Sequence, residues 1–317
     1  MELHDDKYII LTGGAGFIGS HLVHELLTNG YDVRVLDDFS TGRLSNLQDV
    51  LQHIELMEGS ILDENTLARS MDGAEFVFHL AAQVSVPFSI QNPERTLEIN
   101  GTGTQRVLEA AFQAGCRRVV YAGSSSCYGD VANPIQSEAD QIAPISPYGI
   151  SKYQGEEHCH AMAETGKIET VVLRYFNVFG PGQDPSSPYS AVIPKFISLL
   201  IEDERPTIFG DGTQSRDFTY VQNVVEANLL AIEADGVSGH SINVANGRSI
   251  SLLKLIELLR QYLKSNVEPI FAEARTGDIL HSCANIAKAT ELLGYTPSVS
   301  IEVGLAATIN SLTGHVE

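Results

Sequence analysis

The sequence predicts an α/β fold, in which a doubly wound parallel sheet covered by helices on both faces is joined to a second, smaller α/β domain. Three observations support this prediction. Short runs rich in β-branched residues alternate with helix-like runs over the first 176 residues. The strand-like runs are nearly continuous in apolar residues, which is typical of buried parallel strands. After Phe176 the alternation stops, and prolines and glycines cluster.

The first strand, the first helix and the second strand are predicted in the N-terminal part of the chain. Residues 7–12, "KYIILT", and residues 31–37, "YDVRVLD", are rich in the residue types that strands favour. Residues 17–30 between them form a helix that ends at Gly30, since glycine readily closes a helix. This strand–helix–strand order is the unit from which parallel sheets are built.

The following elements continue the same order. Residues 53–59 and 74–81 are predicted strands, and residues 63–71 between them form a helix capped by Asp63. Residues 93–115 form one long helix or two abutting helices. The remaining elements of this part are a strand at 116–124, a helix at 146–166 and a strand at 168–176.

Residues 1–176 are therefore expected to form the first domain, to which the chain returns around residues 212–240. Residues 177–317 form the second domain, whose elements are shorter. Its helices are predicted near residues 221–234, 251–264 and 301–312.

The composition argues against several classes of protein. A net charge of −20 repels nucleic acid and anionic lipid, so neither is an expected partner. The chain has no apolar run of about 18 residues and no signal-peptide pattern at its N-terminus, so we expect a cytoplasmic protein without a membrane span. The four cysteines are scattered, which suits a reducing compartment.

No metal site is expected. His158 and His160 are two residues apart on a predicted helix, so their side chains point to different faces. His79 lies in a buried strand and is expected to be a core residue rather than a catalyst. Asn100 is expected to support the strand that carries the cofactor.

A glycine-rich turn joins the first strand to the first helix. In "TGGAGFIGSHL", Gly13, Gly14, Gly16 and Gly19 have the spacing of a dinucleotide-binding turn. Glycines allow the backbone to approach a ligand closely, and the helix N-terminus offers free N–H groups to a pyrophosphate. A purely structural glycine turn is the alternative, but the flanking strand and helix are the context that dinucleotide binding requires.

Asp37 ends the second strand, 18 residues after Gly19. A carboxylate at this position can accept hydrogen bonds from an adenosine ribose and repels a 2′-phosphate, which favours NAD over NADP. Arg43 lies nearby and weakens that preference slightly. After the fourth strand, Ala81 and Ala82 are small enough for a cofactor to pass close to the backbone.

A tyrosine and a lysine lie four residues apart in the predicted helix 146–166. Such pairs are common in helices by chance, but residues at this spacing share one face, so Lys152 can lie beside Tyr148. A free phenol titrates near pH ~10, so a phenol that acts as a base near neutrality needs a pKa lower by about three units, roughly 4 kcal/mol. A neighbouring ammonium and a cationic nicotinamide ring both lower the pKa of a phenol.

Three hydroxyls, those of Ser124, Ser125 and Ser126, follow the strand 116–124. They lie at the C-terminal end of a strand, where open α/β sheets bind their ligands. A serine at that edge can share the proton of a substrate hydroxyl with Tyr148.

The whole set of motifs resembles the extended short-chain dehydrogenase/reductase family, and within it the NAD-dependent nucleotide-sugar epimerases and dehydratases. The resemblance covers nearly the whole chain, and the motifs follow in the family's order. It implies a Rossmann fold for the first domain, a tightly bound NAD that is regenerated in each turnover, a UDP-sugar substrate, and a homodimer formed through the helices around 93–115 and 147–165. The motifs are "TGGAGFIGSHL", "VLDDFSTG", "HLAAQ", "YAGSSSCYGD", "SPYGISK", "RYFNVFGPGQDP", "GDGTQSRDFTYV" and "ARTGD".

The resemblance also implies roles for individual residues. Tyr148 is the base, Lys152 tunes it and holds the nicotinamide ribose, and Ser124 is the assisting hydroxyl. At the cofactor we further expect Gly13, Gly16, Phe17, Ile18, Gly19, Asp37, Asp38, Ser40, Gly42, Ser60, Ile61, Leu80, Ala81, Ala82, Gln83 and Tyr175. At the sugar nucleotide we expect Ser85, Ser124, Ser125, Ser126, Asn177, Ala191, Val192, Phe209, Gly210, Arg216, Arg275, Asp278 and Ser282.

Some of these roles are more specific. Arg216 and Arg275 match the arginines that hold the diphosphate, and Asp278 matches the acid that holds the uridine ribose. Ser60 is a departure, because the family usually has an acidic residue there facing the adenine. The adenine contact would then fall to the serine and to the backbone at Ile61.

The residues after Ser124 distinguish three reactions on this scaffold. The sugar 4,6-dehydratases have Asp and Glu there, and the decarboxylating enzymes have a Glu two residues on. Ser125 and Ser126 cannot do acid–base work at neutral pH. The remaining reaction is 4-epimerisation, in which Tyr148 takes the proton of the 4-hydroxyl, the transient 4-keto sugar turns over, and the proton returns.

Ser282 lies four residues after the Asp of "GD", where the family lines the pocket near the 2-substituent of the sugar. A small side chain there leaves room for an N-acetyl group. We therefore expect interconversion of UDP-N-acetylglucosamine and UDP-N-acetylgalactosamine, and of the UDP-glucose pair as well. The alternatives are a UDP-glucuronate 4-epimerase, for whose carboxylate Arg205 and Arg248 offer no obvious contact, and a non-catalytic dinucleotide sensor.

Overall fold

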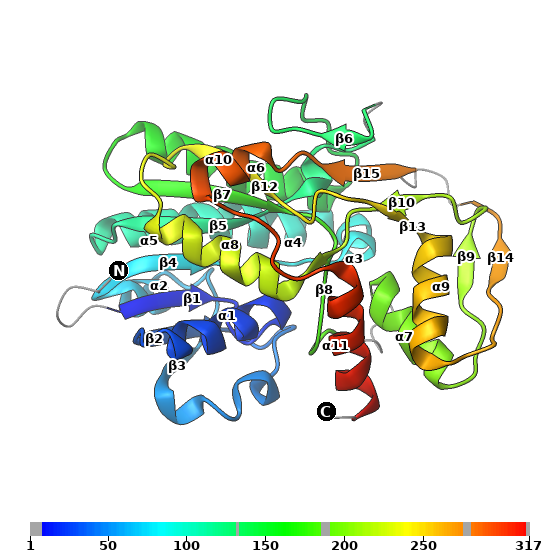
Figure 1. Cartoon of the computed structure of the whole chain (residues 1–317). Coiled ribbons are helices and arrows are strands. Elements are labelled where there is room, and N and C mark those ends of the chain that lie inside the picture. Colours follow the sequence, from blue (N-terminus) through cyan, green and yellow to red (C-terminus); the bar gives the residue numbers. More distant parts are fainter. Residues whose placement is uncertain (1–7, 131–132, 185–190, 275–279, 315–317) are drawn as a thin grey trace.

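A computed structural model describes residues 8–130, 133–184, 191–274 and 280–314. A parallel sheet of seven strands forms the larger part of the molecule (Figure 1), in the order β12-β7-β5-β4-β1-β2-β3. Its strands are β1 (Tyr8–Thr12), β2 (Val33–Asp37), β3 (Ile54–Glu58), β4 (Ala74–His79), β5 (Arg118–Ser124), β7 (Glu169–Tyr175) and β12 (His240–Val244).

The strand order reverses between β1 and β4. From β1 the chain builds β2 and β3 to one side, then returns to place β4, β5, β7 and β12 on the other side. In open α/β sheets such a reversal leaves a crevice at the carboxyl ends of the strands, and ligands bind there. The doubly wound fold predicted from the sequence is therefore confirmed.

Helices cover both faces of the sheet because successive side chains of each buried strand point to opposite sides. Ile9 and Leu11 pack in one apolar core and Ile10 packs in the other. The first core lies under α1 (Phe17–Thr28) and α8 (Val221–Glu233), which pack together. The second lies under α2 (Glu64–Met71), α5 (Gly103–Gln113) and α6 (Pro147–Glu164).

The predicted helix 93–115 is divided into three parts. It begins as α4 (Pro93–Leu97), continues as a π-helical turn at Glu98–Thr102 and ends as α5. The turn contains Asn100, whose amide accepts from Gln83 N at 2.7 Å and donates to Gln83 O at 2.9 Å. As predicted, Asn100 supports the chain that leaves strand β4. Sequence periodicity did not distinguish the π-helical turn from an α-helix.

A smaller body lies at the other end of the molecule (Figure 1). Its apolar core is formed mainly by α7 (Val192–Ile201), α9 (Leu252–Leu263) and α11 (Ile301–Thr313). The sequence predicted two of these helices but not α7. The division at residue 176 stays a prediction. Two strand pairs accompany this core, β8 (Val178–Phe179) with β11 (Thr219–Tyr220), and β9 (Thr207–Phe209) with β14 (Ile270–Ala272).

A four-stranded sheet in the order β13-β10-β15-β6 completes the fold. None of its strands, nor the short helices α3 and α10, was predicted, because short elements carry little periodicity. Their bounds are β6 (Ile135–Gln136), β10 (Ser215–Arg216), β13 (Ile250–Ser251), β15 (His281–Ala284), α3 (Val86–Gln91) and α10 (Ala287–Leu293).

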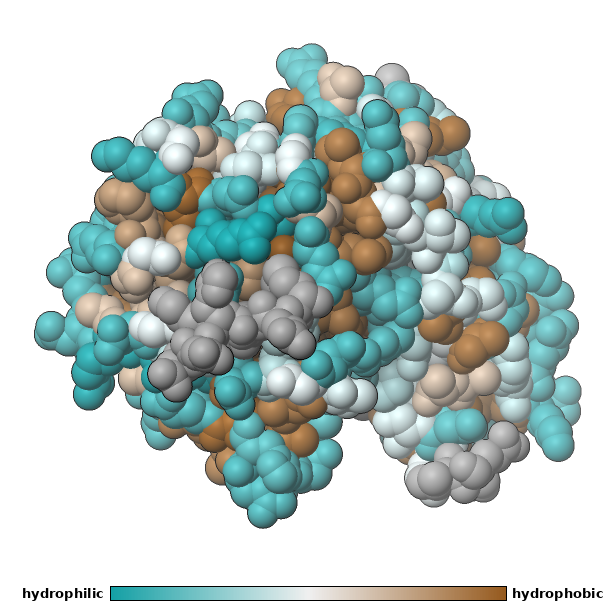
Figure 2. All heavy atoms as spheres, turned by 60° about the vertical axis from the view of Figure 1, so that its left-hand side comes forward, coloured by the Kyte–Doolittle hydropathy of each residue, from teal (hydrophilic) through white to brown (hydrophobic). Residues whose placement is uncertain are grey.

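The surface is mixed in character. On the face shown in Figure 2, hydrophilic side chains cover most of the periphery and hydrophobic ones gather in a band near the middle. Within the described ranges, no helix combines the length and the apolar character that a membrane crossing requires.

Candidate active site

A cleft of about 640 Å³ lies at the carboxyl edge of the seven-stranded sheet. Its walls are formed by the residues that directly follow β1, β2, β3, β4, β5 and β7, and by the start of α6. It contains the point at which the strand order reverses. Small-molecule sites usually measure about 300–1,000 Å³, so a cleft of this size accommodates a large ligand.

The glycine turn at one end of the cleft is shaped for close contact with a ligand. Gly13 has φ +74°, and a Cβ there would lie 2.6 Å from the backbone nitrogen of Ala81. A Cβ on Gly19 would lie 2.2 Å from Gly13 O. Helix α1 begins after Gly16 without a side-chain cap, so its first N–H groups are available to bind an anion.

Asp37 lies beside this turn and is only 7% exposed. Its carboxylate accepts from Ala15 N and from Phe39 N, each at 2.9 Å, and burial raises its pKa. Each carboxylate oxygen can accept more than one hydrogen bond, so capacity remains for a ribose diol. Arg43, which weakened the preference for NAD, forms an ion pair with Asp184.

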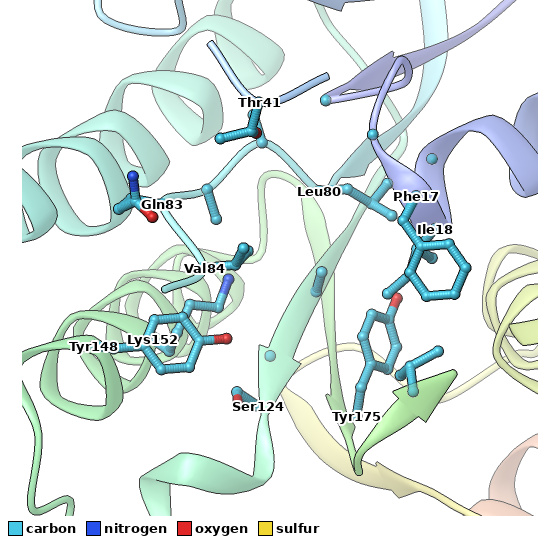
Figure 3. Close-up of a pocket in the computed structure, with 18 of the residues that line it drawn as sticks. Phe17, Ile18, Thr41, Leu80, Gln83, Val84, Ser124, Tyr148, Lys152 and Tyr175 are labelled. Atoms are coloured by element: carbon cyan, nitrogen blue, oxygen red, sulfur yellow. The ribbon is translucent and has the colours of Figure 1, made fainter. Parts of the chain in front are cut away.

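Helix α6 brings the tyrosine and the lysine to the other end of the cleft. The Ser146 hydroxyl caps the helix by accepting from Gly149 N at 3.1 Å, and Pro147 occupies its first position. Tyr148 therefore lies in the first turn, with Lys152 one turn later. Figure 3 shows both side chains entering the pocket from this helix, with Ser124 beside the phenol.

A chain of hydroxyl groups leads to the phenol. Ser124 Oγ accepts from Ser126 N at 3.2 Å and from Ser126 Oγ at 2.9 Å. Since these bonds occupy the acceptor positions of Ser124, its own proton is free to be donated to Tyr148, with which it is hydrogen-bonded. A hydrogen bond donated to the phenol oxygen stabilises its deprotonated form.

Burial has a strong effect on both titratable groups. It raises the pKa of the Tyr148 phenol, and the hydrogen bond from Ser124 opposes this rise. It lowers the pKa of the Lys152 amine to about 7. The phenol of the protein alone therefore has a raised pKa and not the lowered one expected of a base, while burial also weakens the positive charge of the Lys152 amine. Its role as the group that tunes the base stays a prediction for the loaded site.

Most of the residues expected at the cofactor and the substrate line this one cleft, so residues that are far apart in the sequence come together in space. The expected residues that do so are Gly13, Gly16, Phe17, Ile18, Gly19, Asp37, Asp38, Ser40, Gly42, Ser60, Ile61, Leu80, Ala81, Ala82, Gln83, Ser124, Ser125, Ser126, Tyr148, Lys152, Tyr175, Asn177, Arg216 and Ser282.

The other expected residues lie elsewhere. Ser85 is the N-cap of α3, where its Oγ accepts from Phe88 N at 3.1 Å. Arg275 and Asp278 lie outside the described residues. Ala191, Val192, Phe209 and Gly210 belong to the start of α7 and the end of β9, and they are not among the residues that line the cleft.

Two glutamines in the cleft wall were not predicted. Gln183 follows β8, and its Oε1 is buried without a hydrogen-bond partner among the described residues. Gln136 lies in β6 and is 2% exposed. Both lie in segments without helical or strand periodicity, although Gln183 falls within the "RYFNVFGPGQDP" motif.

The site fits NAD. The glycine cradle has no room for a Cβ, which leaves the backbone open to a pyrophosphate. At the other end, Lys152 is 4% exposed and its amine has no acceptor among the described residues, although the side chain lines the cleft. A buried amine in that position suits the hydroxyls of a ribose. The structure describes no group of three or more His, Cys, Asp or Glu side chains that could hold a metal ion.

Comparison with known proteins gives a consistent result. A family model described as the NAD dependent epimerase/dehydratase family matches residues 9–245. A UDP-glucose 4-epimerase from Thermotoga maritima, solved with UDP-glucose, is 37% identical, covers 98% of this chain with all of its own and superposes with a TM-score of 0.92. A UDP-N-acetylglucosamine 4-epimerase from Methanobrevibacter ruminantium, solved with UDP-N-acetylmuramic acid, is 35% identical over 99% of this chain and 100% of its own, with a TM-score of 0.93.

Two further similarities show the range of reactions among relatives. A UDP-glucuronic acid 4-epimerase from Bacillus cereus, solved with UDP-glucuronic acid and NAD, is 32% identical over 98% of this chain and 100% of its own, with a TM-score of 0.88. A UDP-N-acetyl-α-D-glucosaminuronate decarboxylase from Bacillus cytotoxicus is also 32% identical, over 96% of this chain and 97% of its own.

Proposed function

Because the chain belongs to the NAD-dependent epimerase/dehydratase family, we propose that it catalyses the 4-epimerisation of a UDP-hexose. It is an NAD-dependent enzyme of that family. The favoured substrates are UDP-N-acetylglucosamine and UDP-N-acetylgalactosamine, and the UDP-glucose pair is a second substrate pair.

One observation carries the choice of reaction. The carboxylates among the described residues of the cleft wall are those of Asp37 and Asp38, and both lie at the glycine-turn end. Beside Tyr148 the wall offers the hydroxyls of Ser125 and Ser126 instead. Elimination of water needs acid–base groups of intermediate pKa, which serine hydroxyls are not. Oxidation and re-reduction at one carbon need no further acid–base group beyond the phenol and its hydroxyl partner, since bound NAD would accept and return the hydride.

The residues of the chain perform the proton transfers. When bound, NAD supplies a reversible hydride acceptor for carbon 4 of the sugar. Deprotonated Tyr148 accepts the proton of the 4-hydroxyl, and Ser124 donates a hydrogen bond that stabilises the phenolate beforehand. Lys152 holds cofactor hydroxyls and adds positive charge near the phenol. After the keto sugar has turned over, Tyr148 returns the proton.

The size of the pocket wall supports an N-acetylated sugar. Ser282 is one of the residues that line the cleft, and it is only 8% exposed. Its small side chain is therefore part of the packed wall of the cleft. A bulky side chain at this position would fill the space beside it. The similarity to an N-acetylglucosamine 4-epimerase agrees with this substrate.

A UDP-glucuronate 4-epimerase is the alternative. A carboxylated sugar favours a site with a cation for its charge. Among the described residues of the cleft, the cations are Lys152 and Arg216. Lys152 is already expected to bind the cofactor, and Arg216 the diphosphate of the substrate. Arg205 donates to Glu268 O at 2.9 Å and to Pro269 O at 3.0 Å, outside the cleft.

The test uses purified protein without added NAD. UDP-N-acetylglucosamine, UDP-glucose and UDP-glucuronate are incubated separately, and products are separated by anion-exchange chromatography and assigned by NMR. We expect the 4-epimer of the acetylated sugar, with the highest kcat/KM of the three. Catalyst that contains cofactor but forms no 4-epimer from any of them would exclude the proposal, and pentose formation from UDP-glucuronate would indicate decarboxylation.

We also propose a homodimer formed by helices of the larger domain. Ile150 on α6 and Phe112 on α5 are apolar, and their side chains are 46% and 38% exposed. Light scattering behind size exclusion should give twice the chain mass of 34.4 kDa. Ile150→Glu should shift the mass towards the monomer.

A further inference from the structure

Three adjacent strands of the four-stranded sheet place a row of polar side chains on the cleft wall. Arg216 on β10 is paired in register with Ser282 on β15. Strand β15 is paired in turn with β6, which ends at Gln136. All three side chains line the cleft. The row therefore continues from the arginine assigned to the diphosphate, past the serine, to the glutamine.

Ser282 and Gln136 form a buried pair. Ser282 Oγ donates to Gln136 Oε1 at 3.2 Å, and the residues are 8% and 2% exposed. A hydroxyl can donate or accept, so Ser282 can bond to either end of the amide. In both orientations the other end of the amide is left for another partner. Among the described residues, no acceptor bonds to Gln136 Nε2.

The backbone of Gln136 is held firmly. Its carbonyl oxygen accepts from Asn285 N at 2.8 Å and from Asn243 Nδ2 at 3.1 Å. The Ser282 hydroxyl fixes the side chain in addition. A polar group held in place in this way loses little entropy when it binds a ligand and discriminates well between ligands.

We propose that Gln136 is a specificity-determining residue whose side-chain amide hydrogen-bonds the carbonyl oxygen of the acetamido group on carbon 2 of the substrate sugar. The inference rests on the proposed function of the same site. Ser282 leaves the space for the 2-substituent, and Gln136 adjoins that space with an unused donor. An acetamido carbonyl is an acceptor that extends beyond the ring, whereas a 2-hydroxyl has a shorter reach. The pair thus selects for the acetylated sugar by polarity as well as by size.

The test compares two sugars on matched variants. Gln136→Glu keeps the shape but replaces the amide donor by an anionic acceptor, and Gln136→Met removes polarity at similar volume. Gln141→Glu makes the same chemical change at an exposed position of the same segment and serves as the control. We expect the ratio of kcat/KM for UDP-N-acetylglucosamine to that for UDP-glucose to fall at least tenfold in both Gln136 variants, through KM, and to stay within twofold in the control.

If Gln136 had only a structural role, its variants would instead lower kcat/KM equally for both sugars and would also lower the melting temperature of the protein. A ratio unchanged within twofold in both Gln136 variants overturns the inference, as does wild-type protein that converts UDP-glucose but not the acetylated sugar. Calorimetric Kd values for the two UDP-sugars, measured on the same variants, separate this inference from the proposed function. If the wild type turns over neither sugar, a Kd ratio that falls in the variants still supports the role of Gln136, and an unchanged ratio or no binding refutes it.

Discussion

The amine of Lys152 lies 4.3 Å from the centroid of the Tyr121 ring, and the Tyr121 hydroxyl donates to the backbone oxygen of the same lysine at 3.1 Å. Tyr121 is part of β5, so one residue of the central sheet contacts both the side-chain amine and the backbone oxygen of Lys152. The ring face attracts a cation but offers no hydrogen-bond acceptor. The lysine is consequently held in place for a ligand while its pKa is lowered by burial.

The affinity for NAD should depend on pH through Lys152. Because burial lowers the pKa of its amine to about 7, the free protein loses this charge as the pH rises above 7. A ligand that hydrogen-bonds the ammonium binds the charged form better, so affinity is full below pH 7 and declines above it, by at most about tenfold per pH unit. Titration calorimetry of NAD into cofactor-free protein, from roughly pH 6 to roughly pH 8.5, measures this decline in affinity on both sides of the lysine pKa.

Lys152→Met should weaken NAD binding and remove this pH dependence. Lys254→Met, on the exposed face of α9, should leave both unchanged. A wild-type affinity that is flat across the range, or the same slope in Lys152→Met, would contradict the assignment.

Tyr148→Phe should abolish turnover but not cofactor binding. The substitution removes the oxygen that exchanges the proton and keeps the ring, so kcat should fall by about 10²- to 10⁴-fold. Tyr153→Phe on the same helix removes a hydroxyl that does not line the cleft, and we expect it to remain active. A non-catalytic dinucleotide sensor would show no turnover even as the wild type, and both variants would bind NAD as the wild type does.

Gly13→Ala should reduce NAD affinity at least tenfold. Its Cβ would lie 2.6 Å from Ala81 N, so the turn that cradles the pyrophosphate must shift. Gly30 also has positive φ, +80°, but a Cβ there meets no atom within 4 Å. Gly30→Ala therefore carries only the backbone strain, about 1 kcal/mol, and should bind NAD normally. Equal NAD affinities in the two variants would show that the close approach is unimportant.

The stability of the fold should fall at mildly acidic pH because of His79. Its Nδ1 accepts from Thr12 Oγ1 at 2.7 Å. Its Nε2 donates to Thr104 Oγ1 at 2.9 Å, because that hydroxyl gives its own proton to Asn100 O. This buried, neutral histidine fits the expected core role, and burial lowers its pKa to about 3.

The unfolded chain then binds more protons than the folded chain between pH ~6.5 and pH ~3, so stability rises with pH across this window. For this residue the free energy of unfolding should be about 1.4 kcal/mol lower at pH 5.5 than at pH 7.5. Urea titrations of His79→Gln should lack this component of the pH dependence. His53→Gln, at an exposed position, should retain it, and identical pH profiles for all three proteins would refute the assignment.

Local patterns were sufficient to predict residues that line both ends of the cleft. The glycine turn joins β1 to α1, Asp37 ends β2, and Tyr148 and Lys152 lie in the first two turns of α6. Parallel strands bring their carboxyl ends to one edge, so the order of strands and helices alone places these residues together, although they are far apart in sequence.

Gln136 could not be found in this way. It reaches the cleft because β6 pairs with β15, and the contact to Ser282 joins residues 146 positions apart. Two-residue strands carry no periodicity. The protonation of the site was likewise beyond the sequence, because the rise in the Tyr148 pKa results from burial, which depends on the complete fold.

The outermost strand β12 comes from residues 240–244, after the chain has left the sheet and formed α7, the first of the three helices in the core of the smaller body. Until the ribosome has delivered that segment, the outer edge of β7 has no hydrogen-bonding neighbour. An exposed strand edge recruits other chains, so a fragment cut at residue 176 should be prone to aggregation. While residues 176–239 are being synthesised this edge of β7 stays uncovered, and we expect a chain divided at residue 176 to expose it in the N-terminal fragment.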